Sequence, residues 1–155
     1  MNSSIEIFTD GSCHTQQRVG AWASVILVNE HKIVLSGSEI DTTHNRMEIL
    51  AVIKSIDYVR LNHQESRSIQ LVSDSQYMIG LFDREEKFKS SNFKTKSGKD
   101  IQNRDLVIEL LNLAKEVEIK FIKIKAHQKL SEFTKYNIEV DKLARSIVRN
   151  MVRVG

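Results

Sequence analysis

Residues 4–13 read SIEIFTDGSC and bring an acidic residue up against a short apolar run. The run IEIF predicts a buried strand, and Asp10 followed by Gly11 ends it. A carboxylate at the end of a buried strand is costly unless another group compensates its charge. The compensating group has to come from elsewhere in the chain.

The bulk composition is that of an ordinary globular domain. The chain has 155 residues, of which 41% are hydrophobic and 28% are charged, and we expect one domain over residues 1–155. No apolar run approaches the ~20 residues that a membrane span needs, and the N-terminus lacks the pattern of a secretory signal. The single cysteine, Cys13, excludes an internal disulfide and a cysteine-rich zinc site. We therefore expect a cytoplasmic protein, without a membrane partner and monomeric.

The order of the predicted elements favours an α/β fold. Five strands are predicted, over residues 4–10, 21–28, 32–36, 68–73 and 118–125. Apolar residues at helical spacing predict four helices. The first begins after Thr43, the second begins after Asp74 or Ser75 as its cap, the third covers about 101–115, and the last lies near the C-terminus. Three hairpin-linked strands followed by alternating helices and strands predict a mixed sheet with helices packed on its faces.

Four carboxylates occupy the ends of strands or the edges of helical stripes. Asp10 and Asp74 each follow an apolar strand, although a helix cap is the commoner role for Asp74 taken alone. Glu48 and Asp141 each lie about 90° from the centre of an apolar stripe, which predicts the border between core and solvent. If the first and fourth strands are neighbours, the four carboxylates converge at one end of the sheet.

Converging carboxylates predict a metal site. Their repulsion raises their pKa values and destabilises the fold unless a cation lies between them. Ligands that are all oxygen favour Mg²⁺ or Mn²⁺ over zinc, and paired ions of this kind suit displacement at phosphorus. His127, just past the last strand, titrates in the range needed to move protons near such a site, although a lone histidine is most often only a surface residue.

A lysine-rich segment lies between Lys87 and Lys99 and contains no acidic residue. Phe88 and Phe93 alternate with the lysines, a combination that suits contact with phosphates and with sugars or bases. From charge alone, a solvated surface loop explains the segment equally well. The net charge of +3 favours a polyanionic partner only mildly.

The chain resembles type 1 ribonuclease H, including the ribonuclease H domains of reverse transcriptases. The matching pieces, in chain order, are IFTDGSC, GAWASVIL, TTHNRMEILA, SDSQYMI, IKAHQ and NIEVDKLAR, spread over residues 5 to about 148. The resemblance implies a ribonuclease H-like α/β fold, a mixed five-stranded sheet with three antiparallel strands, then two parallel ones, and helices on both faces. It implies an endonuclease that hydrolyses the RNA strand of RNA–DNA hybrids with two Mg²⁺ ions, leaving 5′-phosphate and 3′-hydroxyl ends.

The resemblance also implies roles for particular residues. The metal ligands it implies are Asp10, which bridges the two ions, Glu48, Asp74 and Asp141, with His127 as a mobile auxiliary histidine. The implied substrate contacts are Gly11, Ser12 and Cys13 on the RNA backbone, Asn45 and Gln76 at the minor groove, and Thr43 and Asn103 at a DNA phosphate. The segment 84–104 resembles the basic protrusion that grips the DNA strand, here with Lys87, Lys89, Lys94 and Lys96.

Two other classes of protein remain open at this point. One is a catalytically silent hybrid-binding module with the same fold, and the other is a related polynucleotidyl transferase that acts on another nucleic acid. The TDGS and SDSQY segments argue against the second class. Among the departures from the family pattern, Asp41 stands where an arginine of the phosphate pocket is common, and His44 replaces a usual asparagine or similar residue.

Overall fold

The structure is a computed structural model that describes residues 5–29, 31–63, 68–123 and 132–154. The strands are β1 (Ile5–His14), β2 (Val19–Val28), β3 (His31–Glu39), β4 (Ser68–Ser73) and β5 (Glu118–Lys123). The helices are α1 (His44–Asn62), α2 (Gln76–Asp83), α3 (Glu85–Ser90), α4 (Arg104–Leu113) and α5 (Glu132–Val154). Within the described ranges, no helix has the length and apolarity that crossing a membrane requires.

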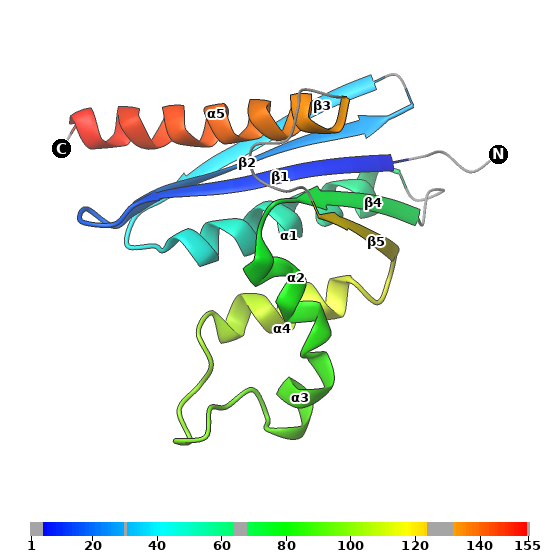
Figure 1. Cartoon of the computed structure of the whole chain (residues 1–155), viewed down its shortest axis with the longest axis vertical. Coiled ribbons are helices and arrows are strands. Elements are labelled where there is room, and N and C mark those ends of the chain that lie inside the picture. The colour runs from blue at the N-terminus through cyan, green and yellow to red at the C-terminus, as the bar shows by residue number, and fades with distance from the viewer. Residues whose placement is uncertain (1–4, 30, 64–67, 124–131, 155) are drawn as a thin grey trace.

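The five strands form one sheet in the order β3-β2-β1-β4-β5. β2 pairs antiparallel with both β1 and β3, whereas β1, β4 and β5 run parallel. Figure 1 shows α5 along one face of this sheet and α1 on the other, with α2 and α4 beyond it. The expected mixed sheet, with three antiparallel strands, two parallel ones and helices on both faces, is confirmed.

The register of β1 against β4 brings two of the predicted carboxylates to the same edge. Phe8 pairs with Val72, the last matched pair of these two strands. Asp10 and Asp74 each lie two residues further along, so both follow the same level of the sheet. The condition on which convergence depended, that the first and fourth strands be neighbours, is therefore met.

Each face of the sheet carries its own apolar cluster, because successive side chains of a strand point to opposite faces. Ile7 belongs to the larger cluster, which α1 and α4 cover, and Phe8 belongs to a smaller cluster under α5. Both side chains are buried. Because of this alternation, β1 lies between two helical layers and contacts both α1 and α5.

The starts of α1 and α2 follow the predicted capping chemistry. Thr43 caps α1, its Oγ1 accepting a hydrogen bond from the Arg46 amide at 3.2 Å. Of the two caps considered for α2, Ser75 is the one used, since its Oγ accepts from the Met78 amide at 3.2 Å. The carboxylate of Asp74 is therefore not the helix cap.

Two local expectations are corrected. Asp10 does not end β1, because the strand continues to His14 by pairing with β2. The lysine-rich segment is not a plain loop, since it contains α3 and projects away from the sheet (Figure 1). Phe88 is 7% exposed and its ring lies 6.1 Å from that of Phe93, so it packs inside the segment instead of offering a free face to a base.

Candidate active site

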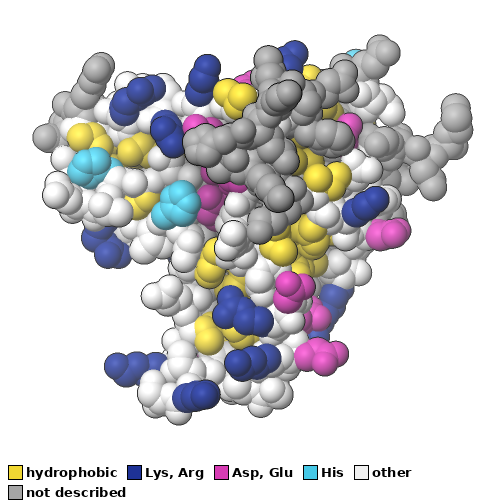
Figure 2. Space-filling view, viewed as in Figure 1, with side chains coloured by type: hydrophobic (Ala, Val, Ile, Leu, Met, Phe, Trp, Pro, Cys, Tyr) yellow, Lys and Arg dark blue, Asp and Glu magenta, His cyan; other side chains and the backbone are white. Residues whose placement is uncertain are grey.

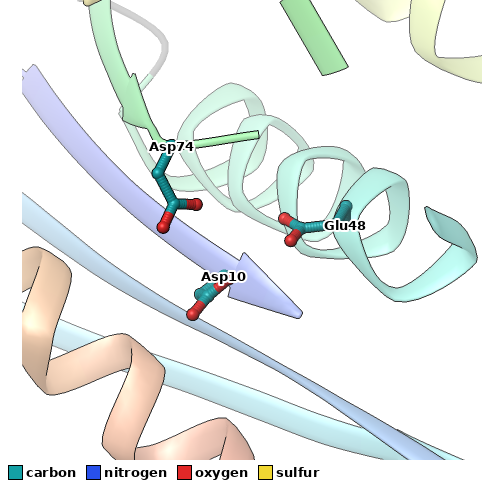
Figure 3. A group of neighbouring side chains, drawn as sticks. All are labelled: Asp10, Glu48 and Asp74. Atoms are coloured by element: carbon teal, nitrogen blue, oxygen red, sulfur yellow. The ribbon is translucent and has the colours of Figure 1, made fainter. Parts of the chain in front are cut away.

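Three carboxylates from three elements converge at one end of the sheet. Oxygen atoms of Asp10, Glu48 and Asp74 all lie within 4.8 Å of one another. Figure 3 shows the three side chains pointing toward one another, from β1, from α1 and from the end of β4. The predicted meeting of these groups is thus present in the structure.

Among the three carboxylates, Asp10 has the pKa that is raised to about 9. It is 5% exposed, and its Oδ1 accepts a hydrogen bond from the Gly11 amide at 2.9 Å. Burial raises the pKa of Asp10 to about 9, and the negative charge of Glu48 adds to the effect. A hydrogen bond with Asp141 and the charge of Asp74 raise this pKa further. Without a cation, Asp10 therefore holds a proton at neutral pH.

Glu48 lies deeper than its sequence position predicts. The helical stripe places it at the border between core and solvent, but it is only 2% exposed because α1 is covered by the sheet and also contacts α4. Its Oε1 lies 3.0 Å from Nε2 of His44, and this interaction raises the pKa of His44. Its Oε2 is buried and has no hydrogen-bond partner among the described residues. That oxygen is free to bind a ligand.

Asp141 reaches the group from α5, on the other face of the sheet. Its side chain is 40% exposed and forms an ion pair with Arg145, one helical turn further, at 3.1 Å. It lies at the rim of the group of three, within hydrogen-bond reach of Asp10. The border position predicted for Asp141 agrees with this partial exposure.

A pocket of about 580 Å³ surrounds the carboxylates. Its lining consists of Asp10, Gly11, Ser12, Cys13, His44, Glu48, Asp74, Asp141, Arg145, Val148 and Arg149. The three residues predicted to follow Asp10 along an RNA backbone are thus in the same pocket as all four carboxylates. Arg145 and Arg149, which also line this pocket, were not predicted from the sequence. They lie four and eight residues after Asp141, and this helical spacing places them on the same side of α5 as Asp141.

A second pocket, of about 430 Å³, adjoins the first through His44. Thr43, His44, Asn45, Gln102 and Asn103 line it, so that the two residues predicted for a DNA phosphate lie together. Asn103 adopts a left-handed conformation at φ 57°, just before α4. Asn45 lines this pocket beside Thr43.

Other predicted contacts lie apart from these pockets. Gln76 is exposed at the start of α2 and lines neither of them. Asp41, at the position where the family often has an arginine, pairs with Arg18 at 2.9 Å. His127 lies outside the described residues.

The four predicted lysines lie in or beside α3. Lys87, Lys94 and Lys96 line a groove of about 320 Å³ together with Arg84 and other residues of the segment. Two of the four are paired with carboxylates: Lys94 with Asp100 at 3.0 Å and Lys89 with Glu85 at 3.7 Å. Figure 2 shows this basic group at the end of the molecule farthest from α5, with acidic and histidine side chains between the two.

Comparison with solved structures agrees with the architecture. The crystal structure of LC9-RNase H1, described as a type 1 RNase H with the type 2 active-site motif, superposes with a TM-score of 0.79 at 19% identity, covering 97% of this chain and 74% of that one. A foamy viral protease-reverse transcriptase in complex with dsDNA gives a TM-score of 0.68 at 17% identity over 92% of this chain and 91% of that one. The fold is therefore that of ribonuclease H, with an acidic group at one end of its sheet.

Comparison of sequences gives the family. The family model for RNase H matches residues 2–149. A Ribonuclease H of Acetivibrio thermocellus is 33% identical over 147 residues, covering 94% of this chain and 95% of that protein. A Ribonuclease H of Wolbachia pipientis wMel is 36% identical over 143 residues, covering 92% and 93%. The chain belongs to the RNase H family.

Proposed function

We propose that this chain is a ribonuclease H, an endonuclease that hydrolyses the RNA strand of RNA–DNA hybrids and leaves 5′-phosphate and 3′-hydroxyl ends. Membership of the family, whose activity depends on divalent metal ions, supports the reaction. The observation that carries the proposal is Asp10, whose pKa burial raises to about 9, with the charges of the neighbouring carboxylates adding to the effect. A cation bound among these carboxylates would favour the ionised form of Asp10.

The proposed cofactor is Mg²⁺, two ions per site, which Asp10, Glu48, Asp74 and Asp141 would hold. The donors are all carboxylate oxygens, which suit a hard cation. The unpartnered, buried Oε2 of Glu48 fits this assignment, because a bound cation would satisfy it. When bound, the ions would supply Lewis acidity at the phosphodiester and activate the attacking water.

The remaining roles belong to residues of the chain itself. We assign Gly11, Ser12 and Cys13 to the RNA strand. Their position in the pocket of Asp10 supports this. We assign Asn45 and Gln76 to the minor groove, where the 2′-hydroxyl distinguishes RNA from DNA. His127 is assigned as the group that moves a proton or releases the product.

The DNA strand is assigned to two places. Thr43 and Asn103 hold one of its phosphates, and the shared pocket that they line supports this. Lys87, Lys89, Lys94 and Lys96 grip it further along, in the segment 84–104. We propose that these parts form a single catalytic domain over residues 1–155, which acts as an intracellular monomer.

A cleavage assay tests the proposal against its alternatives. Labelled RNA–DNA hybrid, duplex RNA, duplex DNA and branched DNA are incubated with the protein, with Mg²⁺ or with EDTA, and Asp10→Asn is run alongside. We expect cleavage of the hybrid's RNA strand only, with Mg²⁺ only, and none by the variant. A hybrid that is retarded in a gel but never cut would identify a binding module, and cutting of branched DNA would identify a related polynucleotidyl transferase. Unchanged cleavage by Asp10→Asn would reject the site.

A further inference from the structure

The wall of the acidic pocket that α5 contributes is basic. Arg145, Val148 and Arg149 line the same pocket as the four carboxylates. Val148 is 7% exposed, and Val140 and Ala144, at helical spacing before it, belong to the apolar cluster under α5, so this side of the helix faces inward. Figure 2 shows Lys and Arg side chains over α5, separated from the lysines of the α3 segment by acidic side chains. The molecule thus carries positive charge on both sides of its acidic site.

The two arginines differ in what they already bind. The guanidinium of Arg145 is 3.1 Å from Asp141 and is held by that carboxylate. Arg149 is exposed, and none of the described carboxylates lies within ion-pair distance of it. A cation at a pocket rim with no anion of its own is available to an anionic ligand.

The path of α5 decides which part of a substrate Arg149 can reach. Figure 1 shows the C-terminal end of α5 at the same end of the sheet as the turn that joins β1 and β2, and away from α3. Ser12 and Cys13, on the last part of β1, line the pocket together with Arg149. Arg149 is eight residues past Asp141, which is about 12 Å along a helix. One strand of a duplex advances about 3.4 Å per nucleotide along its axis, so this distance corresponds to about four nucleotides.

We propose that Arg149 binds a phosphate of the RNA strand within about four nucleotides of the bond that is cut, on the side of the site opposite the lysine-rich segment. The inference rests on the proposed function for the identity of the strand. A guanidinium is suited to the task because it stays charged and meets two phosphate oxygens at once. The RNA strand would then be held from β1 and α5, and the DNA strand from α3 and the pocket of Asn103.

The test measures binding without cleavage. Affinity of the full chain for a short hybrid is followed in EDTA by fluorescence anisotropy over a range of salt concentrations. We expect Arg149→Ala to weaken binding about five- to tenfold at low salt and to flatten the slope of log K against log salt by about 0.7–0.9. Arg149→Lys should keep the slope. Lys142→Ala removes one charge from the same helix outside the pocket and serves as the matched control.

The strand and the position are tested by a double-mutant cycle with the substrate. Each RNA phosphate in turn is replaced by an uncharged methylphosphonate, and the loss caused by Arg149→Ala is measured again. We expect the loss to vanish at one RNA position within four nucleotides of the mapped cut. A variant that behaves like Lys142→Ala, or a loss that depends on a DNA phosphate instead, would overturn the inference. If the wild-type chain cuts nothing but the coupling to an RNA phosphate persists, the proposed function fails and this contact stands.

Discussion

The backbone of Gly11 lies directly against that of Glu48, at the point where β1 passes the first turn of α1. A Cβ atom on Gly11 would lie 2.7 Å from the amide nitrogen of Glu48 and 2.9 Å from the carbonyl carbon of Met47. Neither of these backbone atoms can move without shifting the helix. The spacing of the Asp10 and Glu48 carboxylates is therefore set by the absence of a single methyl group.

Gly11→Ala should separate the two carboxylates. We expect a loss of about 1–3 kcal/mol in the free energy of unfolding, the usual scale for overpacking, together with weaker Mg²⁺ binding. Urea denaturation and titration calorimetry measure the two effects. The control is Gly80→Ala in α2, where the nearest atom is 4.0 Å away and a small gain in stability is expected. Equal behaviour of the two variants would contradict the close contact.

The metal-free protein should lose stability as the pH rises. The pKa of Asp10 is raised from 3.8 to about 9, so between these values the folded state keeps a proton that the unfolded state releases. Stability falls with pH wherever the unfolded state binds fewer protons, so the loss from this group spans about pH 4 to 9. Chemical denaturation in EDTA at a series of pH values measures it.

Two comparisons sharpen that experiment. The side chain introduced by Asp10→Asn does not titrate, so this variant avoids the cost of taking up a proton on folding; in EDTA at pH 8 we expect it to be more stable than the wild type by at least about 2 kcal/mol. Saturating Mg²⁺ should restore stability to the wild type and not to the variant. A metal-free wild type with no such decline, or a variant that is less stable than it, would show that Asp10 is compensated within the protein.

Much of this site follows from short-range patterns, and the missing part has a physical cause. The position of Asp74 just after β4 and Thr43 as the cap of α1 depend on local sequence, and the structure agrees with them. The depth of Glu48 could not be predicted, since a hydrophobic stripe describes one covered face whereas α1 is covered by the sheet and by α4. Likewise, Asp10 lies inside β1 because β2 pairs with the residues that follow it, and pairing partners are set by the whole sheet.

The lysines of the α3 segment should contribute unequally to hybrid binding. Lys94 is already paired with Asp100 at 3.0 Å, whereas no described carboxylate pairs with Lys96. We expect Lys96→Ala to flatten the salt dependence by up to about 0.9 and Lys94→Ala to flatten it less, with the double variant largest. Asp100→Asn frees Lys94 and should strengthen binding. If the salt dependence of binding is unchanged in every variant, the segment is a solvated surface that does not contact the hybrid.

His127→Ala should slow turnover more than it disturbs the metal site. The reason is that a histidine assigned to proton movement or product release acts after the ions and the substrate are bound. Steady-state cleavage of the hybrid gives the turnover number, and calorimetry gives the Mg²⁺ affinity. Asp74→Asn, at a proposed ligand, is the contrasting variant and should lower both. A large loss of Mg²⁺ affinity in His127→Ala would instead make the histidine a ligand.

The two apolar clusters differ in size, so α5 and α1 should unfold locally in a fixed order. Among the described residues, the cluster under α5 has six buried members, namely Phe8, Ala23, Val25, Val72, Val140 and Ala144, whereas the cluster under α1 is far larger. Local opening takes place where the fewest apolar contacts are broken, so backbone amides of α5 should exchange with deuterium before those of α1. Because Asp141 travels with α5, ions that bind all four carboxylates should slow that exchange selectively. Occupancy of the site can therefore be read from a helix that supplies only one of its proposed ligands.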